Sequence, residues 1–170
     1  PTPYAGLDLL PADRSLASLD GFLRTLERRR RLAKLIASLS ARYDRVLLDC
    51  PPVLNEVSEQ IFRAADVLII PLSPSPLAWR ALEDVRLHLA RTFKKHPPIL
   101  PVFSMVDRRR GLHRAALEQQ PEWPVIPMSS QIEQVAVRQA PLGSFDRTSA
   151  ASKAMAALWL GIGRKLSAAS

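Results

Sequence analysis

The chain has 170 residues, of which 47% are apolar, and a formal net charge of +8. This length allows one domain with a sizeable core, and no apolar run is long enough to span a bilayer. The single cysteine, Cys50, excludes an internal disulfide framework. Because no basic-then-apolar signal follows Pro1 either, the sequence favours a cytoplasmic protein.

Apolar runs typical of strands alternate with helical patterns along the chain. In chain order, the sequence predicts a strand at 6–10, helices at 13–18 and 19–39, a strand at 45–49, a helix at 55–65 capped by Asn55, a strand at 67–70, a helix at 77–93, a strand at 99–105, a helix at 111–119, a strand at 125–126, a helical turn or two at 132–137 and a last helix at 149–166. Strands that are apolar throughout and separated by helices indicate a parallel sheet covered on both faces. We therefore predict one α/β domain over residues 1–170, with a doubly wound, mostly parallel sheet.

Asp49 and the prolines mark one edge of this predicted sheet. Prolines directly after strands, such as Pro51, Pro71 and Pro127, are expected to stop the strands and stiffen the following loops. Asp49 ends the predicted strand 45–49, and open α/β sheets bind ligands at the carboxyl ends of their strands. A carboxylate at this position can hold Mg²⁺ directly or through water. Capping of the next helix is the alternative role.

Several segments resemble, in the same order, segments of the ParA/MinD-type deviant Walker ATPases, and ParA is the nearer match. Residues 43–52 (YDRVLLDCPP) look like the Walker B segment, and residues 65–72 look like the strand that follows it. Residues 103–109 (FSMVDRR) are similar to the family's Thr-Met-aromatic-Asp-x-Arg motif. Residues 125–127 and 140–143 resemble the late loop that lies over the adenine.

The resemblance implies a P-loop NTPase-like fold and an ATPase that segregates a plasmid, a chromosome or another cargo. It implies ATP and Mg²⁺ as cofactors, a homodimer bridged by ATP, and a ParB-like or other stimulating partner. The nucleotide-binding residues that it implies are Asp49, Pro51, Met105, Asp107, Arg109 and Pro127, with Asp49 holding Mg²⁺ through water. For Asp107 and Arg109, a solvated basic turn is the alternative.

The family's glycine-rich phosphate loop has no counterpart in this sequence. Glycines occur at positions 6, 21, 111, 143, 161 and 163, and no Gly-Lys pair is followed by Ser or Thr. The sequence therefore resembles the C-terminal portion of a ParA-like ATPase. Phosphoryl transfer depends on positioned phosphates, so residues 1–170 alone are predicted not to hydrolyse ATP. The unpaired flank of the Walker B strand predicts self-association.

Positive charge is concentrated in the second part of the chain. Residues 1–75 hold 10 Lys and Arg against 9 Asp and Glu, whereas residues 76–170 hold 14 against 7. Such an excess favours a polyanionic partner. By resemblance, the partner is nonspecific DNA, which implies association with the nucleoid. The candidate contacts are Arg138, Arg147, Lys153, Arg164 and Lys165; ordinary surface charge is the alternative.

Two other functions stay open. The first is a non-enzymatic adaptor, a degenerate relative that binds DNA or a protein partner. The second is a MinD-like membrane-positioning ATPase, because one face of the last helix is apolar (Met155, Leu158, Trp159, Ile162 and Leu166). Packing against the sheet explains that face more simply, so a membrane is not the favoured partner. The histidines and Cys50 have no metal-ligand spacing.

Overall fold

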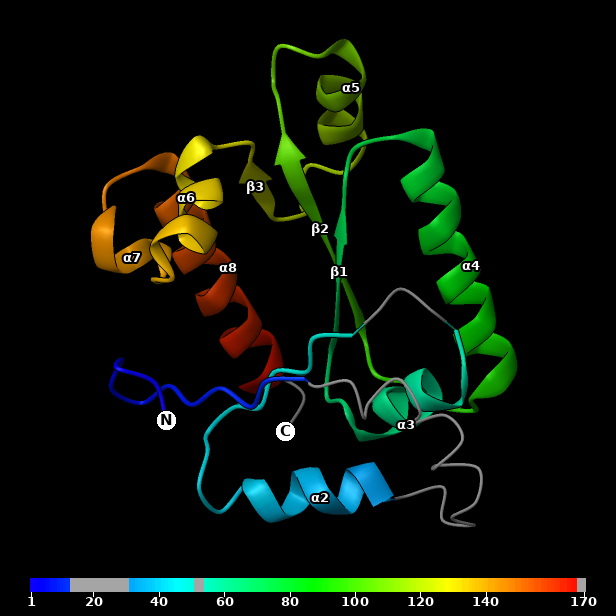
Figure 1. The fold of residues 1–170 in the computed structure, drawn as a ribbon. Helices are drawn as coiled ribbons and strands as arrows, with labels where there is room; N and C mark the ends of the chain where they lie inside the picture. Colours follow the sequence, from blue (N-terminus) through cyan, green and yellow to red (C-terminus); the bar gives the residue numbers. More distant parts are fainter. Residues whose placement is uncertain (13–30, 51–53, 168–170) are drawn as a thin grey trace. The chain divides into compact units, whose positions relative to one another are not determined.

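The computed structural model describes residues 1–12, 31–50 and 54–167. The chain separates into two compact units, Pro1–Ala65 and Asp66–Ser170. Figure 1 shows the helices and strands of both. Within the described ranges, no helix is long and apolar enough to cross a membrane.

The first unit contains two described helices, α2 (Arg31–Leu39) and α3 (Glu56–Ala64), which contact each other. The start of α3 is fixed by a reciprocal cap: the backbone N–H of Ser58 donates to Asn55 Oδ1 at 3.0 Å, and the backbone N–H of Asn55 donates to Ser58 Oγ at 2.8 Å. These two bonds satisfy donors that a helix start otherwise leaves unpaired. The predicted N-cap at Asn55 is confirmed, and α2 confirms the end of the helix predicted at 19–39.

The strands predicted at 6–10 and 45–49 are wrong. Both segments are described, and neither belongs to a strand. Their apolar side chains are exposed, with Leu10 at 93% and Leu47 at 70% of full exposure. A strand forms only where a neighbouring strand pairs with its backbone N–H and C=O groups, and the described part of this unit supplies no such neighbour. The helical residues predicted at 13–30 lie outside the described ranges.

The second unit is built on three parallel strands in the order β1 (Leu68–Leu72), β2 (Ile99–Val106) and β3 (Val125–Pro127). Helices α4 (Pro76–Thr92) and α5 (Gly111–Gln119) connect them, and α6 (Ser130–Arg138), α7 (Leu142–Phe145) and α8 (Ala150–Ser167) follow. Helix α4 packs on β1 and α8 packs on β3, and they lie on opposite sides of the sheet in Figure 1. This arrangement confirms the predicted parallel α/β fold.

Two prolines lie inside strands at positions where their missing N–H removes no ladder hydrogen bond. Alternate residues of a parallel strand direct their N–H groups to opposite neighbours. The Leu68 N–H donates to the carbonyl of Pro98, the residue just before β2. Pro71 is an odd number of residues further along β1, so its backbone nitrogen faces away from β2, toward the outer edge of the sheet. The Phe103 N–H donates to the Pro124 carbonyl, just before β3, so the backbone nitrogen of Pro101 also faces the β3 side. Because the pairing with β3 begins only at Phe103, Pro101 has no β3 residue opposite it. The prediction that Pro71 ends its strand is therefore wrong: Pro71 lies inside β1, which is an edge strand of the sheet in the described ranges.

An aromatic cluster forms the core between the sheet and its connecting helices. Phe103 is fully buried, and its ring lies 6.0 Å from Trp79 of α4 and 5.1 Å from Trp123, centroid to centroid. The two tryptophan rings are 5.1 Å apart. Val106 and Ala116 pack into the same cluster. These contacts join β2, α4 and α5 just below the carboxyl end of β2.

Candidate functional site

The carboxyl end of β2 contains a β-bulge centred on Met105. The pairing with β3 moves from Phe103 opposite Val125 to Val106 opposite Pro127, so β2 advances by three residues and β3 by two. Met105 takes up the extra residue with φ at 55°, in the left-handed region. Strict alternation would place Phe103 and Val106 on opposite faces, yet both belong to the aromatic cluster. The bulge therefore re-aims the end of the strand and the loop behind it.

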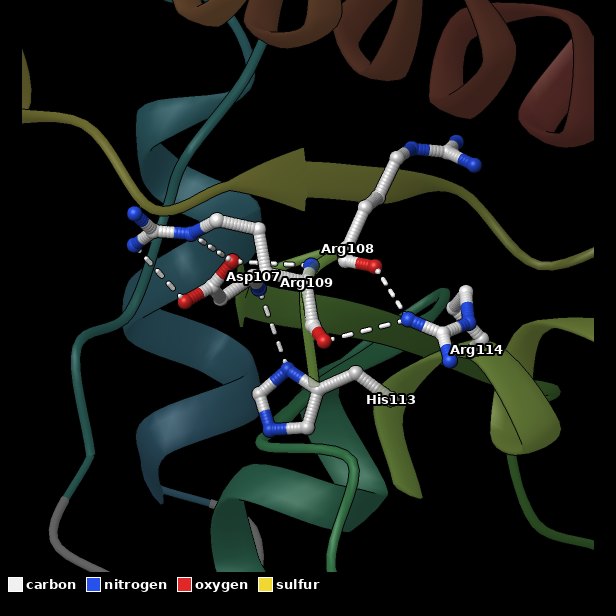
Figure 2. A network of polar contacts seen from close by, with 5 residues as sticks. All are labelled: Asp107, Arg108, Arg109, His113 and Arg114. Atoms are coloured by element: carbon white, nitrogen blue, oxygen red, sulfur yellow. Dashed lines mark hydrogen bonds and ion pairs between the residues drawn. The ribbon is translucent and has the colours of Figure 1, made fainter. Parts of the chain in front are cut away.

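The loop after β2 is closed by an ion pair between Asp107 and Arg109, drawn in Figure 2. The Arg109 guanidinium donates through Nε to Asp107 Oδ1 at 2.9 Å and through Nη2 to Oδ2 at 3.0 Å, and the Arg109 backbone N–H donates to Oδ1 at 3.0 Å. These hydrogen bonds lower the pKa of Asp107 to about 2 and raise the pKa of Arg109. The carboxylate is therefore ionised, and three of its about four acceptor positions are already used within the loop.

Helix α5 holds the same loop through His113 and Arg114, which are drawn in Figure 2. The backbone N–H of Asp107 donates to His113 Nδ1 at 3.0 Å, and His113 is only 5% exposed. The guanidinium of Arg114 donates to the backbone carbonyls of Arg108 at 3.2 Å and Arg109 at 3.0 Å. The loop is thus bonded to the first turn of α5 through its own backbone.

A pocket of about 320 Å³ opens between the ends of β2 and β3, lined by Val106, Asp107, Arg108, Arg109 and Met128. The Met128 N–H donates to the Val106 carbonyl at 2.9 Å, which ties the β3 end to the β2 end. The pocket combines two apolar side chains with a guanidinium, Arg108, that makes no side-chain hydrogen bond within the described ranges. It lies where open α/β sheets bind ligands, and its volume is within the range of small-molecule sites.

The structure brings together some of the predicted nucleotide-binding residues. Asp107 and Arg109 line the pocket, and Pro127 ends β3 opposite Val106. Met105 lies next to the lining residue Val106 in the chain, and its side chain is 57% exposed. Asp49 is exposed in the first unit, and Pro51 lies outside the described residues. The roles of all six stay predictions.

Sequence reasoning assigned no site role to several residues that line the pocket or hold its loop. These are the lining residues Val106, Arg108 and Met128 and the two α5 residues, His113 and Arg114, that hold the loop. His113 follows Asp107 by six residues, across a turn and into a helix. The only sequence signal for His113 was its helical spacing: it lies on the same face of the predicted helix as the apolar Ala116 and Leu117, and that face is expected to be buried.

The basic residues predicted to contact DNA fall into two groups. Two are engaged near α7: the Arg138 guanidinium lies 4.7 Å from the Phe145 ring centroid, and Arg147 Nε donates to the Gly143 carbonyl at 3.1 Å. The other three, Lys153, Arg164 and Lys165, are exposed on α8. Lys153 and Arg164 are about three helical turns apart and share one side of α8.

The apolar face of α8 packs only in part. Ile162 is buried at 7% exposure, whereas Met155 and Trp159 are 41% and 49% exposed. The expectation that all five apolar residues pack against the sheet is therefore corrected. The packed side of α8 centres on Ala151 and Ile162, and Met155 and Trp159 lie at its margin.

Asp49 and the pocket belong to different units, and the residues of the described ranges do not form a complete magnesium–nucleotide site. Within the described ranges, no three His, Cys, Asp or Glu side chains form a metal-binding group. Mg²⁺ in nucleotide sites commonly uses one or two carboxylates and completes its shell with water and phosphate oxygens. The exposed carboxylate of Asp49 is the predicted ligand of this kind. For the phosphates, the sequence offers no glycine-rich loop.

Comparisons with known proteins agree with this α/β architecture. A family model described as an AAA domain matches residues 1–100. The chromosome partitioning protein ParA of Caulobacter vibrioides is 33% identical over 118 residues, which are 65% of this chain and 44% of that protein. The chain therefore spans less than half the length of the curated relatives that it matches.

Two solved structures share the fold. The cell division ATPase MinD of Pyrococcus furiosus aligns with a TM-score of 0.59 at 22% identity, covering 75% of this chain and 54% of that one. The septum site-determining protein MinD of Pyrococcus horikoshii, solved with Mg-ADP, aligns with a TM-score of 0.58 at 22% identity, covering 75% and 53%. The fold is that of the P-loop NTPases. With the match over residues 1–100, the chain belongs to the ParA/MinD-type P-loop ATPase family.

Proposed function

We propose that the protein acts as a ParA-like partitioning or positioning ATPase and that the pocket at the ends of β2 and β3 receives the base of ATP. The observation that carries this proposal is the pocket itself: two apolar side chains, Val106 and Met128, beside the exposed Arg108, at the carboxyl edge of a parallel sheet. Apolar side chains suit the faces of a base, and a guanidinium can stack on the ring or pair with an anion.

In this proposal the chain's own groups have distinct tasks. The Asp107–Arg109 pair fixes the rim of the pocket and so orients what enters it. Asp49 offers its carboxylate to the Mg²⁺ that accompanies ATP, through water. When bound, Mg²⁺ neutralises phosphate charge. The chain has no glycine-rich loop for the phosphates, so residues 1–170 by themselves bind nucleotide weakly and do not turn it over.

The test is equilibrium binding of Mg-ATP to the 170-residue chain, followed by phosphate release. We expect weak binding that Arg108→Ala and Met128→Asp each reduce, and no magnesium-dependent turnover. The matched control is Arg91→Ala, which removes an exposed charge from α4, away from the pocket-lining residues. Binding that all three variants share with the unsubstituted chain would refute the pocket assignment. A clear magnesium-dependent turnover would refute the claim that these residues cannot hydrolyse ATP without a glycine-rich phosphate loop.

The proposal extends to nonspecific DNA, bound by a cytoplasmic, nucleoid-associated homodimer and released when a ParB-like partner stimulates hydrolysis. The support is the exposed basic side of α8, with Lys153 and Arg164 on it. Contacts to phosphates carry no sequence information and weaken with salt, by about 0.9 in the log–log slope for each phosphate contacted.

DNA binding is tested by measuring affinity against salt concentration for Lys153→Ala/Arg164→Ala and for the charge-matched control Lys94→Ala/Lys95→Ala. Both pairs are exposed, so each variant loses the same charge. We expect the slope to shrink by about two in the first variant only. Equal slopes in both variants would leave general surface charge as the explanation.

One observation favours a second function, a non-enzymatic adaptor. The sequence contains no Gly-Lys pair followed by Ser or Thr, so the phosphate contacts of an ATPase are not supplied by these residues. An adaptor of this kind would bind DNA equally well with and without Mg-ATP. A nucleotide-dependent affinity for DNA would decide for the ATPase.

A further inference from the structure

The pocket depends on the loop 107–110, whose shape is only partly explained by its own Asp107–Arg109 ion pair. Arg108 and Arg110 are exposed, and the Arg109 side chain is 88% exposed. Exposed arginines of this kind lose entropy when they are ordered, so they are a poor source of rigidity. The remaining order of the loop has to come from contacts made by its backbone.

Those backbone contacts come from α5. Asp107 N–H donates to His113 Nδ1, Arg114 Nη1 donates to the carbonyls of Arg108 and Arg109, and the Arg114 N–H donates to the Arg110 carbonyl at 3.2 Å. His113 is buried on the same face of α5 as Ala116, which packs in the aromatic cluster. The acceptor nitrogen is thus fixed by the core.

We infer that His113 and Arg114 are positioning residues: they hold the loop 107–110 in the conformation that forms the pocket, and they thereby set its selectivity for a ligand with a flat ring. The nature of that ligand, an adenine nucleotide, rests on the function proposed above. The geometry of the loop is independent of that proposal. Neither residue lines the pocket, so each acts through Asp107, Arg108 or Arg109.

The His113 contact has a chemical signature. To accept from Asp107 N–H, Nδ1 must carry no hydrogen, so the neutral ring is protonated at Nε2. A protonated imidazole carries hydrogens on both nitrogens and can no longer accept. The charged groups around this contact are Asp107, Arg108, Arg109 and Arg110 on the loop and Arg114 on α5, whereas the cluster residues of β2, β3 and α4 are uncharged. Asp107 stays ionised down to its pKa of about 2, so acid that protonates the imidazole leaves this carboxylate charged.

The experiment measures the hydrogen-exchange protection of the Asp107 amide by NMR in the 170-residue chain without ligand. His113→Asn keeps an acceptor at the Nδ1 position, and His113→Leu removes it. We expect protection to fall about tenfold in the Leu variant, as for a buried donor that loses its partner. The Asn variant should stay close to the unsubstituted chain. In that chain, ring nitrogen shifts should show the Nε2–H tautomer at neutral pH, and protection should fall on acidification, but not in the Asn variant.

The Phe103 amide, bonded to the Pro124 carbonyl at 2.9 Å, is the internal control for global unfolding. If the Leu variant loses protection at the Phe103 amide too, that variant is globally destabilised. The inference is then tested by the pH dependence of Asp107 protection in the unsubstituted chain and in the Asn variant. Equal Asp107 protection in the Asn and Leu variants, a flat pH profile, or an Nδ1–H tautomer would overturn the inference. Absence of ATP binding would instead refute the proposed ligand, because the loop readout uses no ligand.

Discussion

The left-handed backbone at Met105 makes a prediction about glycine that is opposite in sign to the usual one. Glycine within a strand normally destabilises a protein relative to alanine, by about 0.5–1 kcal/mol. Met105 has φ at 55°, a conformation that costs a residue with a Cβ about 1–2 kcal/mol. We therefore compare Met105→Gly with Met105→Ala, because both remove the 57% exposed side chain.

The expected difference follows from these two terms. Relief of the left-handed conformation outweighs the extra entropy that glycine loses on folding, which leaves the Gly variant more stable than the Ala variant by about 0.5–1 kcal/mol. For a unit of the size of Asp66–Ser170, this corresponds to a melting temperature higher by about 2–8 °C. A second comparison is available at Gln139, the exposed C-cap of α6 with φ at 49°.

The assay is thermal unfolding followed by circular dichroism, with urea unfolding to obtain the free energy. At Gln139, Gly should again be more stable than Ala, since this is the position where helices favour glycine. If Met105→Gly is less stable than Met105→Ala while Gln139 behaves as expected, Met105 does not adopt the left-handed conformation in solution. The bulge described at the end of β2 would then be refuted.

Three further predictions concern the loop, the core and the first unit. Because its folded pKa of about 2 is below the usual value, the stability that Asp107 draws from Arg109 is present above the unfolded pKa and is lost progressively as pH falls from there through about 2; a carbon-13 titration of the Asp107 carboxyl should show this midpoint, and Arg109→Gln should move it back up. Phe103→Ala should destabilise the second unit by about 3–5 kcal/mol, since Phe103 is fully buried; a loss below about 1 kcal/mol in urea unfolding would contradict its place in the core. Asn55→Ala should destabilise α3 by about 1 kcal/mol, whereas Asn55→Asp, which keeps an acceptor, should not; similar unfolding of the two variants would contradict the cap.

The elements that could be predicted from sequence are those whose stabilising partners are local or repeated. The cap at Asn55 and the strands β1, β2 and β3 were found from side-chain type and spacing. The segments at 6–10 and 45–49 are just as apolar, and no strand forms there. Composition reports the tendency to be buried, whereas a strand also needs a neighbour for its backbone. The residues of a segment do not reveal whether a neighbouring strand is present to pair with it.

The sequence predicted the motif residues of the site, Asp107 and Arg109, but not the contacts that hold their loop in place. Asp107 and Arg109 are two residues apart and stand at a strand end, so sequence alone brings them to one loop. The contact between His113 and Asp107 depends on the turn that reverses the chain before α5. The bulge at Met105 depends on the shift in pairing with β3. Both depend on how the chain is arranged in the fold, and no residue type marks them.

The aromatic cluster under the loop gives the protein an internal optical reporter. Trp79 and Trp123 lie 5.1 Å apart with a 35° angle between their rings, close enough for their excited states to couple and to produce a paired band in circular dichroism. Val106 touches this cluster and also lines the pocket. A ligand that displaces Val106 would therefore change the spectrum of an unlabelled chain, and occupancy of the pocket could be followed without any added dye.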